Sequence, residues 1–300
     1  MKYTYREQRF SEETRKIIDK MNEILDEYDG MILTARQLYY QFVARDIVPN
    51  TQASYKRLTD ILSNARLAGL VDWDMIEDRG RVPQSPSEWR DVKQIADIVV
   101  GAFRLPRWKG QPRYVELWVE KQALAGVLAP LAREFHVTMM VNKGYSSQSA
   151  MRDSALRYQR CMASYGSTEP VLKYLGDHDP SGKDMRRDIA DRMAMFGVEG
   201  LRVDMIALTT DQVKLYDPPP NPAKITDPRA KQYIEEFGEE SWELDALPPR
   251  ELQRIIRESI RSEVDQTAWD RVIKEENRQR KLYEKSIQSL DIGKKKSSDD

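Results

Sequence analysis

Cysteine and histidine are scarce in this chain, which has one cysteine and two histidines among its 300 residues. The lone Cys161 cannot close an internal disulfide, and two histidines leave too few ligands for a typical zinc site. No apolar run approaches the ~18 residues that a membrane helix needs, and residues 1–6 (MKYTYR) are too polar for a secretory signal. We therefore expect a cytoplasmic protein in a reducing setting, with no membrane partner.

An excess of charge of either sign is also lacking. The 48 basic and 49 acidic residues give a net charge of −1, which does not by itself indicate nucleic-acid binding. Residues 31–113, however, hold 13 basic and 9 acidic side chains. With 40% apolar residues, the chain can fill the core of one large or two smaller domains, and its N-terminal part has a charge balance compatible with DNA binding.

The first third of the chain predicts a small helical DNA-binding module. Apolar residues at helical spacing, behind Ser11 and Thr34 as caps, predict helices over residues 11–28, 35–45 and 52–67. A short strand or wing at residues 70–73 completes a winged helix-turn-helix pattern. We assign residues 1–30 to an N-terminal helix. Residues 31–112 are assigned to the winged-helix domain and a connector, which holds one helix at 87–103.

From residue 114 the pattern changes to alternating strands and helices. The predicted strands are residues 114–119, 137–141, 170–175 and 201–208, and the predicted helices are 122–134, 148–163 and 183–196. This alternation predicts a doubly wound α/β domain with a largely parallel sheet over residues 113–215. Residues 216–300 predict a helical extension with helices at 228–237, 249–264 and 267–290, followed by a disordered tail.

Acidic residues follow two of these strands. Glu120 ends the first strand, and Asp177 and Asp179 follow the strand 170–175 in the sequence GDHDPSG. Ligands of parallel α/β sheets lie beyond the carboxyl ends of the strands, and aspartates two residues apart point to the same side. Carboxylate oxygens suit Mg²⁺, so the three acids predict a magnesium site for phosphodiester chemistry. The alternative is that the two aspartates only cap the next helix.

A tyrosine could use such a site. Residues 36–40 read RQLYY, so that Arg36 lies four residues before Tyr40, on the same helix face. A phenol with a pKa of about 10 needs a metal, a base or a cation to act as a nucleophile. Arg36 could steady the phosphate or the phenolate, while Tyr39 points away and favours packing. The alternative is that both tyrosines are core aromatics.

Further polar residues are candidates for the same chemistry. Lys121 and Lys143 lie beside the predicted site, and the basic residues of helix 52–67 would follow the DNA backbone: Lys56, Arg57 and Arg66. Solvated surface positions are the alternative for the lysines. We expect His178 to pack rather than to bind metal. The acids of WELDAL, residues 242–247, could join the metal site or a dimer contact, or the motif could be a structural strut.

Four motifs, in this order along the chain, resemble those of the A subunit of topoisomerase VI and the related meiotic double-strand-break transesterases. RQLYY at 36–40 looks like the family's Arg-x-x-Tyr-Tyr motif, and VEKQAL at 119–124 looks like its VEKDA strand end, with Gln122 in place of the acid. KGY at 143–145 is similar to its Lys-Gly-Tyr-Pro turn, with Ser146 in place of proline. DHDPSG at 177–182 is similar to its Asp-x-Asp-Pro-His-Gly, with Ser181 in place of histidine.

The resemblance covers roughly residues 33–189 and implies a winged helix followed by a Toprim domain. It implies that Tyr40 attacks a phosphate of double-stranded DNA and forms a 5′-phosphotyrosyl link, with Arg36 on the scissile phosphate. Glu120, Asp177 and Asp179 would bind Mg²⁺, and Glu120 could instead hold a second metal or act as a general acid or base. In the family the tyrosine of one protomer works with the metal site of the other, so a homodimer cuts both strands.

The chain is shorter than a typical A subunit and carries no ATPase, so strand passage would need a separate ATPase or regulatory subunit. A nucleoid-associated location in the cytoplasm is expected. Two other functions remain open. The first is a Toprim nuclease, in which water replaces Tyr40 as the nucleophile. The second is a non-catalytic winged-helix DNA-binding protein.

Overall fold

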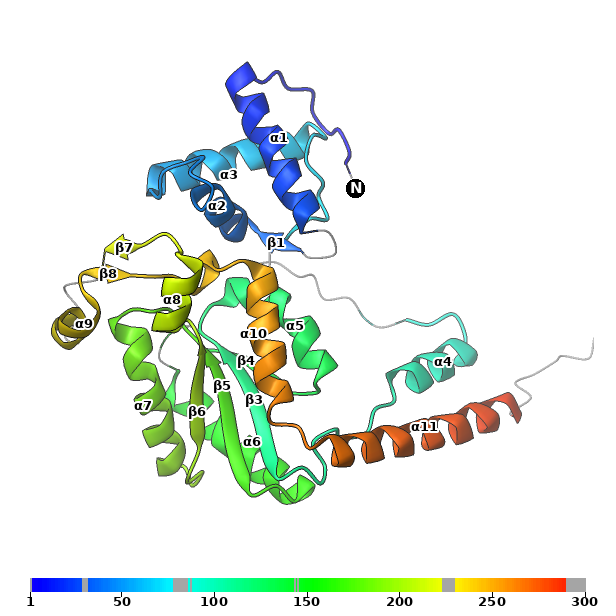
Figure 1. Cartoon of the computed structure of the whole chain (residues 1–300). Coiled ribbons are helices and arrows are strands. Elements are labelled where there is room, and N and C mark those ends of the chain that lie inside the picture. Colours follow the sequence, from blue (N-terminus) through cyan, green and yellow to red (C-terminus); the bar gives the residue numbers. More distant parts are fainter. Residues whose placement is uncertain are drawn as a thin grey trace, which may run out of the picture.

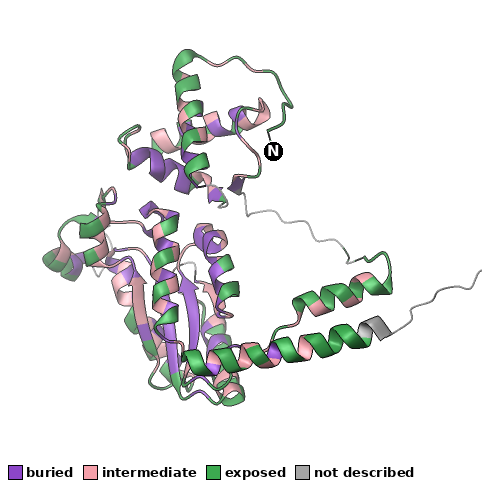
Figure 2. Cartoon of the chain, turned by 45° about the vertical axis from the view of Figure 1, so that its right-hand side comes forward, coloured by how far each residue is buried: buried purple, intermediate pink, exposed green. Residues whose placement is uncertain are grey.

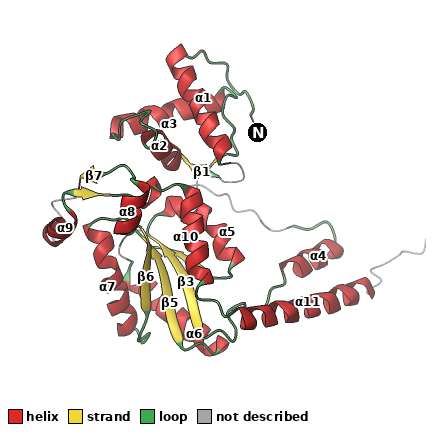
Figure 3. Cartoon of the chain, in the orientation of Figure 1, coloured by secondary structure: helices red, strands yellow, loops and turns green. Residues whose placement is uncertain are grey.

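The computed structural model describes residues 2–28, 32–77, 86, 88–142, 144, 146–222 and 230–289, without the side chains of 287–289. These residues contain eleven α-helices and a four-stranded parallel sheet, so the predicted α/β class is confirmed (Figures 1 and 3). Among the helices of this described part, none combines the length and the apolar character that crossing a membrane requires.

The sheet is built from β3 (Arg113–Val119), β4 (Thr138–Val141), β5 (Glu169–Leu175) and β6 (Arg202–Ala207). Their spatial order is β4-β3-β5-β6, and every neighbouring pair is parallel. β3 and β5 lie side by side with Val119 opposite Leu175. The residues that follow these two strands therefore emerge next to each other at one edge of the sheet.

Helices cover both faces of the sheet (Figure 1). α5 (Ala125–Glu134) and α10 (Pro249–Arg261) pack on one face, against Val115, Leu117 and Val119. α6 (Gln148–Tyr165) and α7 (Pro180–Met195) pack on the other, against Tyr114 and Trp118. The alternation of side chains along β3 thus supplies two cores, as a parallel sheet buried on both faces requires. α8 (Thr210–Tyr216) follows β6.

The N-terminal unit has a core of its own. α1 (Glu12–Glu27), α2 (Ala35–Val43) and α3 (Gln52–Leu67) bury their apolar faces together. Ser11, Thr34 and Thr51 cap the three helices, each accepting a hydrogen bond from the backbone N–H three residues later; the caps predicted at Ser11 and Thr34 are confirmed. β1 (Leu33–Thr34) pairs in parallel with β2 (Ile76–Glu77).

The strand predicted at residues 70–73 is wrong: that segment is an irregular turn, and the strand is β2. Gly69 ends α3 in the left-handed region at φ 72°. Arg66 then stacks over the Trp73 ring at 4.2 Å and donates to the Trp73 carbonyl. Asp72 accepts from the Asp74 N–H. These local contacts stabilise the turn, so the strand begins only at Ile76.

Two helix starts also differ from the prediction. α4 (Val92–Ala102) begins later than residue 87, because the Asp91 side chain caps the Gln94 N–H at 2.8 Å. α7 begins earlier than residue 183, because Asp179 caps it. The helix predicted at 122–134 opens as a 3-10 turn, η1 (Gln122–Leu124).

The C-terminal third contains α9 (Ala230–Phe237), the antiparallel pair β7 (Asn221–Pro222) and β8 (Glu240–Ser241), and the 3-10 turn η2 (Leu244–Ala246). α10 and the long α11 (Gln266–Ser289) follow. α11 extends away from the sheet and runs beside α4 (Figures 1 and 3). Residue 290, the predicted end of this helix, and the predicted disordered tail lie outside the described residues.

Glu276 ties α11 to the segment that leads into β3. Its buried carboxylate accepts from the Leu105 N–H at 2.8 Å, from Arg107 at 2.8 Å and from Arg280 at 2.7 Å. Glu276→Ala leaves buried cationic partners unpaired, so we expect the free energy of unfolding to fall by about 3 kcal/mol. Glu275→Ala is the matched control, because Glu275 pairs with Arg278 at the exposed surface and such pairs contribute little. Thermal unfolding checks both variants; equal midpoints would contradict a structural role for Glu276.

Candidate functional site

Glu120 and Asp177 meet at the carboxyl edge of β3 and β5. The Asp177 N–H donates to Glu120 Oε2 at 3.2 Å. Gly176 permits this approach, since a Cβ there would lie 2.7 Å from the Tyr174 ring and 3.0 Å from Glu120 Oε2. Burial raises the pKa of Asp177 to about 7; Lys121 lowers it and the nearby Glu120 raises it further. The two acids therefore share one desolvated environment.

Asp179 lies in the same loop but faces the start of α7. Its Oδ1 accepts from the Gly182 N–H and from the Ser181 hydroxyl, both at 2.7 Å. The capping role that we weighed for the aspartates thus applies to Asp179, whereas Asp177 takes part in ion pairing. A Cβ on Gly182 would lie 2.1 Å from the Asp177 carbonyl oxygen, so this loop is wound tightly enough to require a glycine.

Gly182→Ala should therefore distort the acidic loop. We expect the free energy of unfolding to fall by about 3 kcal/mol or more, because the new methyl group meets a backbone oxygen that cannot move freely. Gly101→Ala is the control: Gly101 is also helical and has open space at its Cβ position, so alanine should stabilise by about 0.5–1 kcal/mol. Chemical denaturation measures both, and a stability of Gly182→Ala equal to that of the native chain would contradict the tight loop.

Two basic side chains from different parts of the chain, Lys121 and Arg36, connect this strand edge to two acidic residues. Asp245 lies in η2, and Glu243 directly precedes it. Lys121 Nζ lies 2.9 Å from Asp177 Oδ1, 3.0 Å from Glu243 Oε2 and 2.7 Å from Asp245 Oδ1. Arg36, from α2, pairs with Glu243 and, at 3.2 Å, with Asp245. We call these five residues the ionic cluster. It connects the N-terminal unit directly with the sheet.

Tyr40 lies against the ionic cluster. Its side chain is only 3% exposed, and the Arg36 guanidinium lies 5.7 Å from its ring centre, as their spacing on one helix face predicts. Its hydroxyl interacts with both Glu243 and Arg36. Burial, and then the charges of Glu243 and Asp245, raise the pKa of Tyr40 well above its ordinary value. In this arrangement Tyr40 is a neutral phenol.

Neighbouring residues keep Tyr39 and His178 in packing roles, as predicted. The Tyr39 hydroxyl accepts from the Thr51 N–H at 2.9 Å at the start of α3. His178 is 1% exposed, and its ring bonds Tyr233 at 2.8 Å and Thr210 at 3.0 Å. The rings of His178 and Tyr233 also meet edge to face.

Glu243 and Asp245 are the residues whose place the sequence left undecided. Leu244 belongs to the sheet core and Ala246 to the N-terminal core, so the segment spans both. The Leu244 N–H also donates to Asp177 Oδ1 at 2.8 Å. The acidic–apolar motif at residues 242–247 was the sequence feature that pointed to these two acids. In the structure, the motif is a strut between the two cores and also lies beside Tyr40.

The residues that would hold Mg²⁺ supply the hard oxygen ligands this ion prefers. As placed, no three histidine, cysteine, aspartate or glutamate side chains of the described residues could hold one ion together. The reason is visible in their partners: Asp179 caps α7 and Asp177 pairs with Lys121. The donor chemistry and the meeting of Glu120 with Asp177 fit a magnesium ion, whereas Asp179 is turned toward the start of α7.

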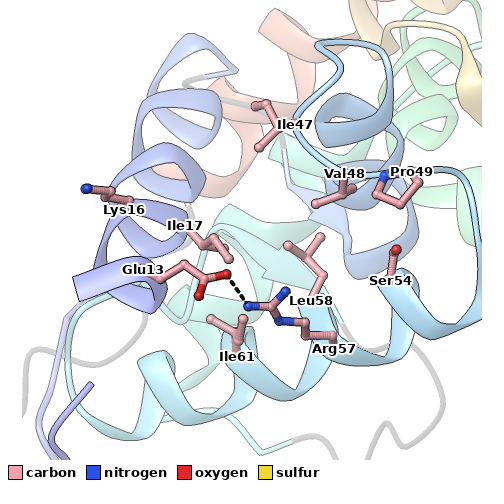
Figure 4. Close-up of a pocket in the computed structure, with 10 residues that line it drawn as sticks. All are labelled: Glu13, Lys16, Ile17, Ile47, Val48, Pro49, Ser54, Arg57, Leu58 and Ile61. Atoms are coloured by element: carbon pink, nitrogen blue, oxygen red, sulfur yellow. Dashed lines mark hydrogen bonds and ion pairs between the residues drawn. The ribbon is translucent and has the colours of Figure 1, made fainter. Parts of the chain in front are cut away.

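The predicted DNA contacts have different surroundings. Arg57 pairs with Glu13 at 2.6 Å beside a pocket lined by Ile17, Leu58 and other apolar residues (Figure 4). Arg66 and Arg36 line a second pocket that reaches Ala123 of the sheet unit. Lys56 lies exposed on α3. Lys143 lies outside the described residues, and so does Tyr145 of the KGY turn.

Comparisons with protein-family models, with curated proteins and with solved structures found no match to this chain. The chain is an α/β protein with an acidic strand edge. The ionic cluster joins this edge to a buried tyrosine on a separate helical unit.

Proposed function

We propose that this chain is a Mg²⁺-dependent DNA-cleaving transesterase of the topoisomerase VI A type, with a winged-helix N-terminal unit and a Toprim sheet. The observation that carries the proposal is the meeting of Arg36 and Tyr40 with Lys121 and Asp177 through one ionic cluster. These residues come from three of the resembling motifs, far apart in the chain. Their proximity is what a tyrosine nucleophile and a phosphate-binding edge would need.

In the proposed reaction, the Tyr40 oxygen forms a bond to phosphorus, and the bond from phosphorus to the 3′ oxygen of the DNA breaks. Tyr40 loses its proton, the departing oxygen gains one, and the product is a 5′-phosphotyrosyl link. Arg36 and Lys121 hold the phosphate, and Glu120 exchanges the proton at the ribose oxygen. A magnesium ion held by Asp177 and Asp179 would neutralise charge that develops on the phosphate.

In the proposal, the ionic cluster is the arrangement that precedes DNA binding. Burial would raise the pKa of Glu243, but Lys121 and Arg36 outweigh it and hold that pKa at about 2. So weak a base leaves Tyr40 protonated. In the proposal, a DNA phosphate replaces Glu243 at Arg36 and Lys121, which frees the tyrosine. A homodimer would then cut both strands, with one Tyr40 acting on each strand.

A metal-dependent nuclease is the second candidate, and the burial of Tyr40 favours it. A tyrosine that is 3% exposed and kept neutral by burial and then by two acids has the properties of a core residue. In that case the same acids would activate water, and both DNA ends would be free of protein.

The products decide between the two candidates. Radiolabelled plasmid is incubated with the purified protein and Mg²⁺. The reaction is then stopped with detergent, and the DNA is digested with nuclease. A transesterase leaves radiolabelled nucleotide on the protein, attached through Tyr40. Cleaved plasmid with label-free protein would support hydrolysis, and plasmid left intact under all conditions would contradict both.

A further inference from the structure

A pocket of about 430 Å³ lies between the N-terminal unit and the sheet unit; we call it the interunit pocket. The N-terminal unit stands over one end of the sheet unit (Figure 2). One wall of the pocket is a single face of α3, with Tyr55, Thr59 and Ser63 at spacings of four residues. The start of α2, the turn that holds Trp73, and Ala123 of η1 supply the other sides. The volume falls within the range of about 300–1,000 Å³ that small-ligand sites have.

The residues that line the interunit pocket favour an anion. They include two arginines, Arg36 and Arg66, and no acidic residue. Guanidinium groups bind phosphate through paired, charge-assisted hydrogen bonds. The Arg36 side chain is 45% exposed and pairs with Glu243, so a phosphate can reach it and exchange with that carboxylate. The pocket of Figure 4 differs, because Glu13 and mostly apolar residues line it.

The interunit pocket also offers groups that recognise a nucleobase. Its two aromatic rings, Tyr55 and Trp73, are each held by a neighbour. The Tyr39 ring packs against Tyr55 at 5.3 Å, and the Arg66 guanidinium lies 4.2 Å from the Trp73 ring centre. Within the described part of the chain, the hydroxyls of Tyr55 and Ser63 have no hydrogen-bond partner. Aromatic rings beside such polar groups are typical of sites that bind unpaired bases.

Arg36 connects the interunit pocket to the proposed cleavage site. Its guanidinium lines the pocket and also lies 5.7 Å from the centre of the Tyr40 ring. In the proposed function Arg36 holds the scissile phosphate, so the base next to that phosphate is within reach of the pocket. A base that is paired and stacked in a duplex presents only its edge, whereas a base turned out of the helix can enter a pocket.

We propose that the interunit pocket binds one unpaired nucleotide of the DNA, next to the scissile phosphate. The substrate class is then DNA with an unpaired or easily extruded base at the cutting point, rather than any regular duplex. Turning a base out of the helix costs free energy, and it costs least where the base is already unpaired, so the pocket selects such sites. The inference rests on the proposed function for the role of Arg36, but it concerns binding and does not require cleavage.

The test measures binding in EDTA, where no metal-dependent cleavage occurs. Two short duplexes are compared by fluorescence anisotropy, one fully paired and one with a single bulged 2-aminopurine nucleotide. We expect the native chain to bind the bulged duplex about tenfold more tightly, because the extruded base gains a stacking contact. The fluorescence of 2-aminopurine itself should fall on binding, because its base stacks against an aromatic ring.

Three variants test whether the interunit pocket causes this preference. Ser63 is exposed on α3, so Ser63→Phe should fold and fill the pocket from its rim; the preference should disappear while the paired duplex binds as before. Ala53→Phe is the matched control, since Ala53 is also exposed on α3 but does not line the pocket, and it should keep the preference. Tyr55→Leu removes a ring without filling the pocket and should weaken binding of the bulged duplex only. Thermal unfolding confirms that each variant is folded.

Equal affinity of the native chain for the two duplexes would overturn the inference and leave the proposed transesterase standing. A Ser63→Phe chain that keeps the preference would also overturn it. So would a native chain that binds 2′-deoxyadenosine 5′-monophosphate more tightly than the bulged duplex, because the pocket would then serve a free nucleotide. A preference for the bulged duplex without any phosphotyrosyl product would support the pocket and contradict the transesterase. A chain that binds neither duplex would contradict both.

Discussion

Tyr40→Phe should abolish the covalent protein–DNA product. Phenylalanine keeps the ring that packs in the N-terminal core but removes the oxygen that would bond to phosphorus. Without a nucleophile there is no phosphotyrosyl link, so we expect label transfer to fall below detection, a loss of about a thousandfold or more. The variant also loses the interaction of the hydroxyl with Glu243 and Arg36, which should change stability by about 1 kcal/mol only.

Tyr39→Phe is the matched control for this experiment. Tyr39 is adjacent, equally buried, and bonded through its hydroxyl to the start of α3. Its loss should lower the thermal midpoint modestly and leave label transfer intact. If Tyr40→Phe still cuts plasmid and leaves free DNA ends, the nucleophile is water rather than Tyr40, and the nuclease is favoured.

Asp177→Asn should remove metal-dependent cleavage while sparing the fold. The substitution keeps the shape of the side chain and its bond from the Leu244 N–H, but takes away the charge that a cation needs. We expect cleavage to fall by several powers of ten, with no rescue by excess Mg²⁺. Calorimetric titration of Mg²⁺ into the native and variant chains gives a second measurement that is independent of turnover.

In metal-free buffer, the pKa of Asp177 determines whether Asp177→Asn is more or less stable than the native chain. The pKa of Asp177 is raised to about 7 in the folded chain, chiefly by burial. A raised carboxyl pKa means that its contribution to stability is present at low pH and is lost as the pH rises through about 7. Asparagine does not ionise, so at pH 8 the variant should melt at the same temperature as the native chain or higher.

Asp188→Asn is the control, since Asp188 pairs with Arg192 on α7, away from the strand edge. It should retain cleavage and magnesium binding. A variant at Asp177 that cleaves normally, or that binds Mg²⁺ as the native chain does, would remove Asp177 from the site.

The sheet and its acidic edge could be predicted from sequence because their signals are local. Each of the four strands is a short apolar run bounded by polar residues, and Glu120 and Asp177 directly follow two of them. Parallel strands in register then bring the two acids together. The strand β2 was misplaced, because the stacking of Arg66 on Trp73 and the turn at Asp72 do not show in an apolar pattern.

The ionic cluster could not be predicted, because no local signal specifies it. Arg36, Lys121 and Glu243 come from three distant parts of the chain, and only the docking of η2 between two cores brings them together. The acids of residues 242–247 were visible as candidates, but their partners depend on that docking. The turn of Asp179 toward α7 is different, because it is a local helix cap on the Gly182 N–H, which the sequence already offered as the alternative to metal binding.

The strut at residues 242–246 also affects the order of events during synthesis. A ribosome releases the helical unit and the sheet first, and Leu244 and Ala246, which complete both cores, are synthesised after them. The tyrosine and the strand edge are therefore not joined in the nascent chain. In the proposed reaction, the nucleophile would therefore stay apart from its phosphate-binding edge until residues 242–246 have been made.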